Sequence, residues 1–351
     1  NCILLPIEAE SQDTALRIFS TLNDRCMPLS DSDIFKAQFY KFYTGKGEKD
    51  AFIKRWKELE ELTEKIFHPI NGTPMDELFT RYMYFVRAKM GIKSSTTEAL
   101  RKFYEKDNYA LLKKDSTFND MITLAHFWED VSNQDRDRYS PRILHRLFVL
   151  NYAPNGMWTY FVSVYFMKNK DANGMLDDDA FYQFLNRITG FIWTYAVTNP
   201  GVNALRTPVY AEMVNIVNNR PVSFDGFKFE PATVKSMFAN FTFSNTRPIT
   251  KSMLAWWAFQ DDLQELISLE TVLEIEHIYA RNRFDKDKSL SDVKNLEAIG
   301  NKALLEKRIN IRAADYRFSD KIKYYQGFTN SRNQKKEGTK NHELINLATA
   351  A

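Results

Sequence analysis

The sequence has little of what builds disulfide-rich, membrane-spanning or turn-rich proteins. Its 351 residues include only two cysteines, Cys2 and Cys26, too few for a disulfide framework or a zinc knuckle. A reducing, cytoplasmic setting is therefore expected. The longest apolar run, near residues 157–167, is about half as long as a bilayer requires, so no membrane partner is expected. Glycine and proline, with 12 and 11 copies, are too scarce to suggest a turn-rich β architecture.

The start of the chain also lacks two features. No basic region precedes its short apolar run, so we see no signal peptide. It does not begin with methionine, and we expect the sequence to be a piece of a longer protein.

Aromatic residues are plentiful at 14% of the chain, which favours long helices with large side chains in their cores. From about residue 48 to residue 267, apolar residues recur with helical period. The clearest helices are predicted over residues 51–67, 75–90, 118–131, 141–152, 178–197 and 250–267. Another is expected within residues 28–43, capped by Ser30 or Asp31. A strand over residues 2–9 and a helix over residues 12–25 are expected before it.

The pattern changes after Ser268. Residues 269–279 alternate and contain β-branched and aromatic side chains, which predicts a strand. A charged loop follows over residues 280–294, and residues 296–310 read as a second strand that runs into a helix. A further helix is predicted within residues 315–327. We therefore predict a mainly α protein in which a large helical domain precedes a small α+β unit of ββα type.

Positive charge is concentrated in this last unit. The formal net charge of the chain is only +3, yet residues 281–336 contain 15 Lys and Arg against 7 Asp and Glu. A basic zone of this kind suits a phosphate-backbone partner. A solvated surface is the alternative interpretation of the same charges.

Four residues of the ββα unit have side chains that could hydrolyse a phosphodiester. A neutral imidazole can activate water, and a Mg²⁺ ion held by hard oxygen ligands can stabilise charge on the phosphate and on the leaving oxygen. Glu276, His277, Asn301 and Asn310 provide these groups. However, adjacent residues of a regular strand point to opposite faces, so Glu276 and His277 share one site only if the strand ends or distorts there.

These residues resemble a known family of nucleases. "IEHIY" followed about twenty residues later by "IGNKALLEKRIN" is similar to the HNH, or His-Me finger, signature. More closely, it resembles the C-terminal domain of GmrSD-type, modification-dependent restriction endonucleases. The Phe-x-x-Lys helix of that family has its counterpart in "RFSDKIKYY" (317–325).

A second motif agrees with this resemblance. "IFSTLNDRCMPLSDSDIFK" (18–36) is similar to the end of the family's N-terminal ParB/sulfiredoxin-like domain. The matching positions are Leu22, Asn23, Arg25, Leu29, Ser30, Asp33 and Lys36. The family's Asp-Gly-Gln-Gln-Arg motif is not found in the sequence, so nucleotide dependence is expected only through a missing N-terminal part. Cys26 replaces a usual Gly, Ala280 a usual Pro and Lys302 a usual Leu.

The resemblance implies a role for each matching residue. His277 would be the general base, and Asn301 would fix the loop that orients it. Asn310, which completes the catalytic set, and Glu276 would bind Mg²⁺ or Mn²⁺. The candidates for phosphate contacts are Lys302, Lys307, Arg308, Arg312 and Lys321.

The expected organisation has three parts. Residues 1–47 would be the remnant of the N-terminal domain, residues 48–267 the helical domain, and residues 268–351 the nuclease domain. The leading interpretation is a metal-dependent DNA endonuclease of phage defence. Its expected partners are DNA, modified or unmodified, and a second copy of the chain in a homo-oligomer. The alternative is a non-catalytic helical interaction or sensing module with a degenerate nuclease domain. An RNA-directed nuclease would use the same backbone chemistry.

Overall fold

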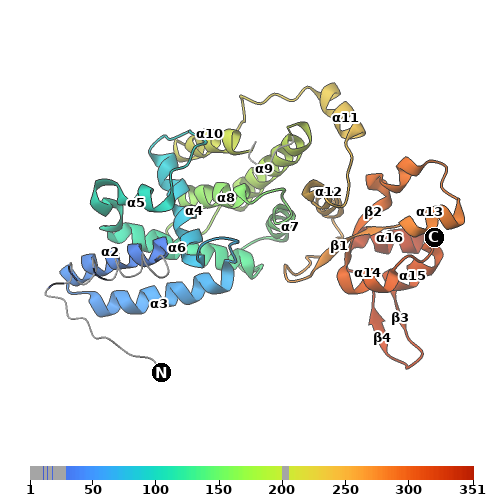
Figure 1. Ribbon diagram of the computed structural model, residues 1–351, viewed down its shortest axis with the longest axis horizontal. Helices are drawn as coiled ribbons and strands as arrows, with labels where there is room; N and C mark the ends of the chain where they lie inside the picture. Colours follow the sequence, from blue (N-terminus) through green and yellow to red (C-terminus); the bar gives the residue numbers. More distant parts are fainter. Residues whose placement is uncertain (1–10, 12–13, 15–17, 19–28, 200–204) are drawn as a thin grey trace.

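A computed structural model describes residues 11, 14, 18, 29–199 and 205–351. Figure 1 shows a large helical body joined to a smaller C-terminal lobe. The strand expected over residues 2–9, Cys2, Cys26 and the motif positions Leu22, Asn23 and Arg25 lie outside the described residues, as does most of the helix expected over residues 12–25.

The helical body is formed by α2 to α12. These helices are α2 (Asp31–Gly45), α3 (Lys49–Ile66), α4 (Pro74–Lys89), α5 (Leu100–Tyr109), α6 (Asp115–Ser132), α7 (Pro141–Leu150), α8 (Met157–Asn169), α9 (Asp178–Thr198), α10 (Arg206–Val217), α11 (Pro231–Asn240) and α12 (Pro248–Ala258), with the short 3₁₀ helix η1 (Ala110–Leu112) after α5. The prediction of a mainly α protein with a large helical part is therefore confirmed.

The first described helix belongs to this body. Phe35 and Phe39 of α2 are buried, and the ring of Phe39 lies 5.3 Å from that of Phe118 and 6.1 Å from that of Trp56. Aromatic side chains of this size supply much of a core's buried area. The structure therefore joins residues 31–45 to the helical core.

The predicted cap of α2 is confirmed. The Ser30 hydroxyl accepts a hydrogen bond from the backbone N–H of Asp33, whose carboxylate accepts from the backbone N–H of Ser30. This reciprocal pair is a capping box. Lys36, another position of the N-terminal motif, forms an ion pair with Glu60 at 2.9 Å.

The helix predicted over residues 250–267 is shorter than expected. α12 ends at Ala258, and the carboxylate of Asp261 then accepts the backbone N–H of Leu263. The same carboxylate contacts His342 on the last helix of the chain. An Asp side chain that binds nearby backbone competes with helix formation, and the tertiary contact with His342 holds it in place.

The C-terminal lobe contains two small antiparallel sheets and several short helices. Its elements are β1 (Leu273–His277), α13 (Arg281–Asp287), η2 (Val293–Leu296), η3 (Ile299–Asn301), β2 (Lys302–Glu306), α14 (Lys307–Ala313), α15 (Phe318–Gln326), β3 (Gly327–Thr329), β4 (Lys335–Glu337) and α16 (His342–Ala350). β1 pairs with β2, and β3 pairs with β4. The β1–β2–α14 segment has the predicted ββα order, although the loop predicted over residues 280–294 contains α13.

The two faces of the β1–β2 hairpin pack in different directions. Leu273 and Leu304 join the core of the helical body, whereas Ala303 and Leu305 join a separate small core with Tyr325. Successive side chains of a strand alternate between faces, so one hairpin can be buried on both sides. The hairpin thus connects the lobe to the helical body.

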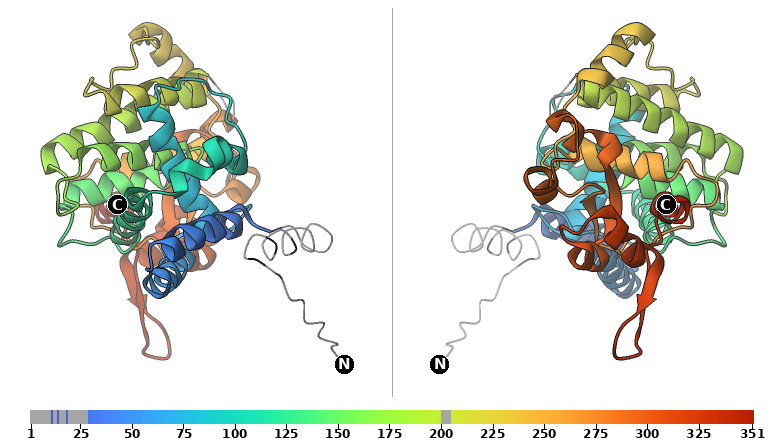
Figure 2. Two further views of the ribbon diagram at one scale, coloured as in Figure 1. Left: turned by 90° about the vertical axis from the view of Figure 1, so that its left-hand side faces the viewer. Right: turned by 90° about the vertical axis from the view of Figure 1, so that its right-hand side faces the viewer.

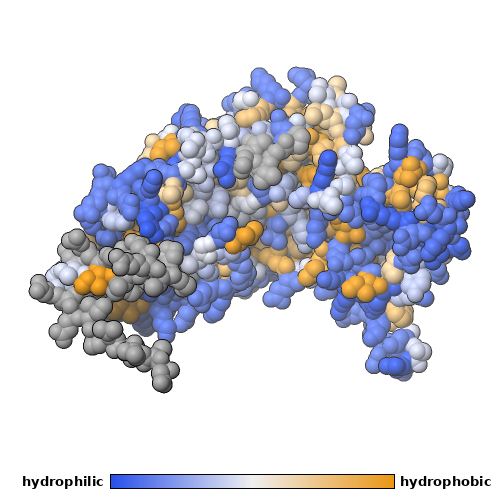
Figure 3. Space-filling model, in the orientation of Figure 1, coloured by the Kyte–Doolittle hydropathy of each residue, from blue (hydrophilic) through white to orange (hydrophobic). Residues whose placement is uncertain are grey.

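The face of the molecule seen in Figure 3 is mainly polar. In Figure 3 the C-terminal lobe, at the right of the view, is largely hydrophilic with small separate hydrophobic patches. The β3–β4 hairpin projects away from the lobe in the views of Figures 1 and 2. None of the described helices has the length and apolar character needed to span a membrane.

Candidate functional site

The candidate site is built around the end of the first strand of the hairpin. His277 is the last residue of β1, and its partner in the antiparallel register is Lys302, the first residue of β2. α14 begins directly after β2 ends at Glu306. Because the hairpin and the helix are contiguous in the chain, His277, Asn301 and Asn310 are placed within one compact unit.

Asn301 joins the two ends of the loop between the strands. Its Oδ1 accepts a hydrogen bond from the backbone N–H of Tyr279 at 2.7 Å. Its Nδ2 donates to the carbonyl oxygens of Tyr279 at 3.1 Å and Leu296 at 2.9 Å. The backbone carbonyl of Asn301 also accepts from the N–H of Ile278 at 2.9 Å. Three of these four bonds hold Ile278 and Tyr279, directly after His277, and the fourth holds Leu296. This is where the resemblance expects an asparagine that fixes the loop.

His277 is largely buried against charged side chains. Its side chain is 11% exposed, and Nε2 lies 3.7 Å from Oε1 of Glu297, too far for a hydrogen bond. Among the described residues, this buried Nε2 has no hydrogen-bond partner. Burial lowers the pKa of His277, the positive charge of Arg281 lowers it further, and Glu297 opposes the change. The imidazole is therefore neutral at physiological pH.

Glu297 is the acceptor at the centre of this cluster. It forms ion pairs with Arg281 and, at 2.9 Å, with the ammonium of Lys302. Burial favours a raised pKa for Glu297, but Lys302 and Arg281 outweigh it and hold the pKa below its usual range. A charged carboxylate, neutralised by two cations, thus faces a neutral histidine.

Glu276 points to the opposite face of β1. Its Oε1 accepts hydrogen bonds from the ammonium of Lys321 at 2.6 Å and from the hydroxyl of Tyr325 at 2.7 Å. The same ammonium donates to the backbone carbonyl of His277 at 2.7 Å. β1 stays regular to its end, so the alternation of strand side chains separates Glu276 from the imidazole of His277.

Asn310 contacts a different glutamate. Its Nδ2 lies 2.8 Å from Oε2 of Glu274, so this helix residue is joined to the strand two residues before Glu276. Because strand residues two apart share a face, Glu274 and Glu276 lie on the same side of the hairpin, away from the imidazole of His277. The expected convergence of Glu276, His277 and Asn310 is absent.

The residues expected to hold a divalent metal therefore do not fit one in this arrangement. The Glu276 carboxylate is already neutralised by Lys321. Within the part of the chain that the structure describes, no group of three or more His, Cys, Asp or Glu side chains could hold a metal ion. Hard cations need several convergent oxygen ligands, and here the oxygens bind an ammonium, a phenol and an amide instead.

The five candidates for phosphate contacts differ in their exposure to solvent. Lys302 and Lys321 are buried, and their ammonium groups bind acceptors within the protein, so neither is placed to contact a phosphate. Lys307 and Arg308 lie exposed on α14. Arg312 is half-buried and donates to the backbone carbonyls of Arg308 and Glu337.

Sequence reasoning missed the residues that surround the predicted ones. Glu297 and Arg281 flank His277, and Tyr325 completes the contacts of Glu276. Glu297 precedes Asn301 by four residues in a loop that also contains Asp285, Asp287 and Asp292, so no sequence signal singles it out. Tyr325 follows Lys321 by one helical turn, a spacing that places two side chains on the same face.

Comparison with protein-family models and with curated proteins finds no match to this chain.

Proposed function

We propose that residues 268–351 form a DNA-directed phosphodiester hydrolase, an endonuclease in which His277 is the general base. One observation carries this proposal: Asn301 clamps the backbone directly after a neutral histidine whose Nε2 has no hydrogen-bond partner among the described residues. A general base needs a free lone pair and a fixed position. The excess of positive charge over residues 281–336 supports a polyanionic substrate.

The chemistry follows from the position of this lone pair. Once the pair of Arg281 with Glu297 opens and uncovers Nε2, His277, with its proton on Nδ1, accepts at Nε2 the proton of a water molecule whose oxygen attacks the phosphorus. The bond from phosphorus to the leaving oxygen breaks, and that oxygen takes a proton from solvent. Arg281, which is 53% exposed beside Glu297, is placed to contact the phosphate once its pair with Glu297 opens. No step is assigned to a metal, because the expected ligands do not lie together.

A second candidate is supported by a separate observation. The ion pair of Glu276 with Lys321 and the burial of His277 suit a non-catalytic domain of the same fold. In that case the lobe binds or senses a partner, and the charged groups hold its shape.

One assay separates the two candidates. The chain is incubated with plasmid DNA, phage DNA containing modified cytosines, and a structured RNA, each with Mg²⁺, Mn²⁺ or EDTA. The variants are His277→Ala and Asn301→Ala, and the matched control is His126→Ala, because His126 is an exposed histidine of α6. We expect cleavage that His277→Ala abolishes, that Asn301→Ala weakens by at least about tenfold, and that His126→Ala leaves unchanged.

Two results would contradict the nuclease proposal. Equal cleavage by wild type and His277→Ala would show that another group, or a contaminant, performs the reaction. No cleavage of any substrate by the folded chain would favour the non-catalytic candidate. The EDTA samples measure the metal requirement directly, and the RNA sample tests the choice of substrate.

A further inference from the structure

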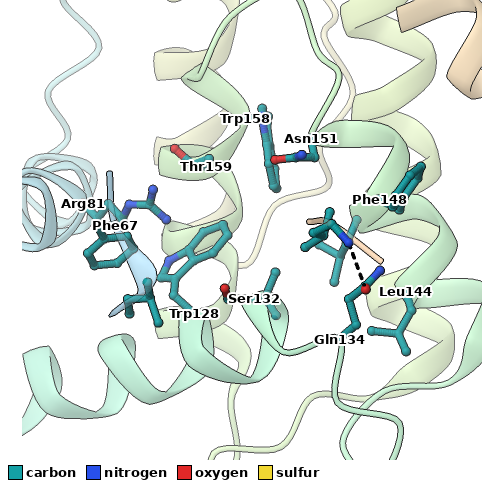
Figure 4. Close-up of a pocket in the computed structure, with 14 residues that line it drawn as sticks. Phe67, Arg81, Trp128, Ser132, Gln134, Leu144, Phe148, Asn151, Trp158 and Thr159 are labelled. Atoms are coloured by element: carbon teal, nitrogen blue, oxygen red, sulfur yellow. Dashed lines mark hydrogen bonds between the residues drawn. The ribbon is translucent and has the colours of Figure 1, made fainter. Parts of the chain in front are cut away.

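A cavity lies in the helical body, next to the segment that leads to the C-terminal lobe. Its volume is about 150 Å³, and its walls come from the end of α3 and from α4, α6, α7 and α8, with Leu269 on one side. Figure 4 shows Phe67, Arg81 and Trp128 on one side of this cavity and Gln134, Leu144 and Phe148 on the other. The cavity is independent of the candidate site around His277.

Arg81 provides the charged group of this cavity. Its side chain is 9% exposed, and its Nε donates to Oε1 of Glu77 at 2.8 Å. The guanidinium lies between two rings, with its carbon 4.3 Å from the ring centre of Phe67 and 4.2 Å from that of Trp128. The two rings hold the guanidinium in place, and Arg81 forms part of the cavity wall.

The donors of Arg81 are mostly unused. Its buried Nη1 has no hydrogen-bond partner among the described residues, and Nε makes the side chain's only hydrogen bond within them. A buried donor without an acceptor is unfavourable. Glu77 takes one edge of the guanidinium, while the terminal amino groups have no acceptor from the described chain.

The remaining walls are apolar at depth and polar at the rim. Leu147, Phe148 and Trp158 are buried around the cavity, whereas Ser132 and Asn151 are exposed. An apolar cavity of about 150 Å³ is large enough for a single benzene ring. A ligand that fills this space needs an apolar body and, at one end, an acceptor for the guanidinium.

We propose that this cavity binds a small carboxylate with an apolar body. The carboxylate accepts hydrogen bonds from the terminal amino groups of Arg81, whose planar fork matches a carboxylate in a two-point contact. The body of the ligand lies against Leu147, Phe148 and Trp158. Ligand sites of this type combine an apolar lining with a few polar groups that fix orientation.

Leu269 forms one wall of the cavity and belongs to the segment that joins the helical body to the C-terminal lobe. Gln134 donates from Nε2 to the carbonyl of Ile267 at 3.0 Å, and its Oε1 accepts from the N–H of Leu269 at 3.3 Å. Both residues belong to the segment that precedes β1 (Leu273–His277). A ligand in the cavity therefore contacts the chain segment that connects the helical body to the hairpin.

Titration with benzoate tests the proposal, with benzyl alcohol as the uncharged analogue. Trp128 and Trp158 line the cavity, so tryptophan fluorescence of the full chain reports binding. The variants are Arg81→Lys, which keeps a cation beside Glu77, and Leu147→Phe, which fills the cavity and leaves Arg81 in place. Arg55→Lys is the matched control, because Arg55 also stacks on a ring, Phe118, but lies outside the cavity.

We expect saturable quenching by benzoate that weakens at least about tenfold in Arg81→Lys and disappears in Leu147→Phe. The Arg55→Lys control should bind as the wild type does, and benzyl alcohol should bind at least about tenfold more weakly than benzoate. Equal binding of benzoate and benzyl alcohol would overturn the role of Arg81. Undiminished quenching in Leu147→Phe, or no saturable quenching by benzoate up to its solubility limit, would overturn the site itself and leave a cavity that holds only water.

Discussion

The ammonium group of Lys321 lies 2.6 Å from a carboxylate oxygen of Glu276, and both side chains are almost completely buried. Tyr325 adds a hydrogen bond to the same oxygen, and the ammonium also binds the backbone carbonyl of His277. The ammonium of Lys321 therefore binds the oxygens of β1 that a metal ion would need. This relationship, more than any other, separates the observed arrangement from a metal site.

Removing one member of this pair should be costly. Lys321→Met leaves the Glu276 carboxylate buried without its cation, and we expect the free energy of unfolding to fall by about 3–5 kcal/mol. Urea denaturation followed by circular dichroism measures the change. The double variant Glu276→Gln, Lys321→Met should lose less than Lys321→Met alone, because it leaves no unpaired charge.

Lys307→Met is the matched control for Lys321→Met. Lys307 is 56% exposed and lies 3.9 Å from Glu274, so its loss should change the free energy of unfolding by less than about 0.5 kcal/mol. A similar effect of the two substitutions would mean that the Glu276–Lys321 pair is not buried in solution.

Asn301 should protect the loop that follows His277. Asn301→Ala removes the side-chain acceptor of the Tyr279 amide and both donors, so the exchange of that amide with solvent deuterium should become faster. The loss in the free energy of unfolding is expected to be about 1–3 kcal/mol. Hydrogen exchange followed by mass spectrometry measures the first effect.

Asn301→Asp provides a graded comparison. The carboxylate keeps an acceptor for the Tyr279 N–H but loses the donors to the carbonyls of Tyr279 and Leu296. We expect its exchange rate to fall between those of wild type and Asn301→Ala. Unchanged protection in the alanine variant would show that the backbone bond between Ile278 and Asn301 is sufficient to hold the loop.

The buried histidine should make stability depend on pH. Burial and Arg281 lower the pKa of His277 in the folded state, so the unfolded chain binds the proton more tightly than the folded chain does. The contribution of neutral His277 is complete above the unfolded pKa of about 6.5 and is lost as the pH falls toward the folded value. The free energy of unfolding, measured at intervals from about pH 8 to about pH 5, should therefore decrease as the pH falls.

His277→Asn isolates this contribution. His145 also has a pKa lowered by burial and acts in the same direction, so only the difference between wild type and variant belongs to His277. We expect the variant to lose less stability on acidification than the wild type. Lys302, Arg281 and Glu297 face His277 and are present in both proteins, so the comparison holds them constant. Parallel pH profiles would contradict a buried neutral imidazole.

The exposed cations of α14 should contribute to DNA affinity if the lobe binds DNA. Lys307→Ala with Arg308→Ala removes two exposed positive charges, so binding should weaken and the slope of log affinity against log salt should fall by about one for each lost phosphate contact. Fluorescence anisotropy at several salt concentrations measures both quantities. The matched control is Lys54→Ala with Lys57→Ala, which removes the same charge from the exposed face of α3. Equal effects of the two double variants would indicate only a general charge effect.

Local sequence patterns were sufficient for much of the fold. Apolar residues at helical spacing predicted most of the long helices, and Ser30 or Asp31 as a cap predicted the start of α2, because these signals depend on neighbours within a few residues. The order of strand, loop, strand and helix was readable for the same reason. The early end of α12 was not, because Asp261 is held by His342, which lies about eighty residues away in the chain.

The candidate site divides in the same way. The sequence by itself determined which chemical groups lie near the end of β1. Strand alternation required β1 to end or distort before Glu276 and His277 could share a site, and the regular register shows that it does not. Only the tertiary structure decided their partners. Lysine is rarely buried without a partner, and the partner of Lys321 is Glu276, which lies 45 residues away in the chain. No local pattern therefore distinguishes Lys321, which is buried, from Lys307, which stays in solvent. Burial depends on elements that meet only after the chain folds. Packing therefore decides which charged side chains of the lobe form buried ion pairs and which remain in solvent.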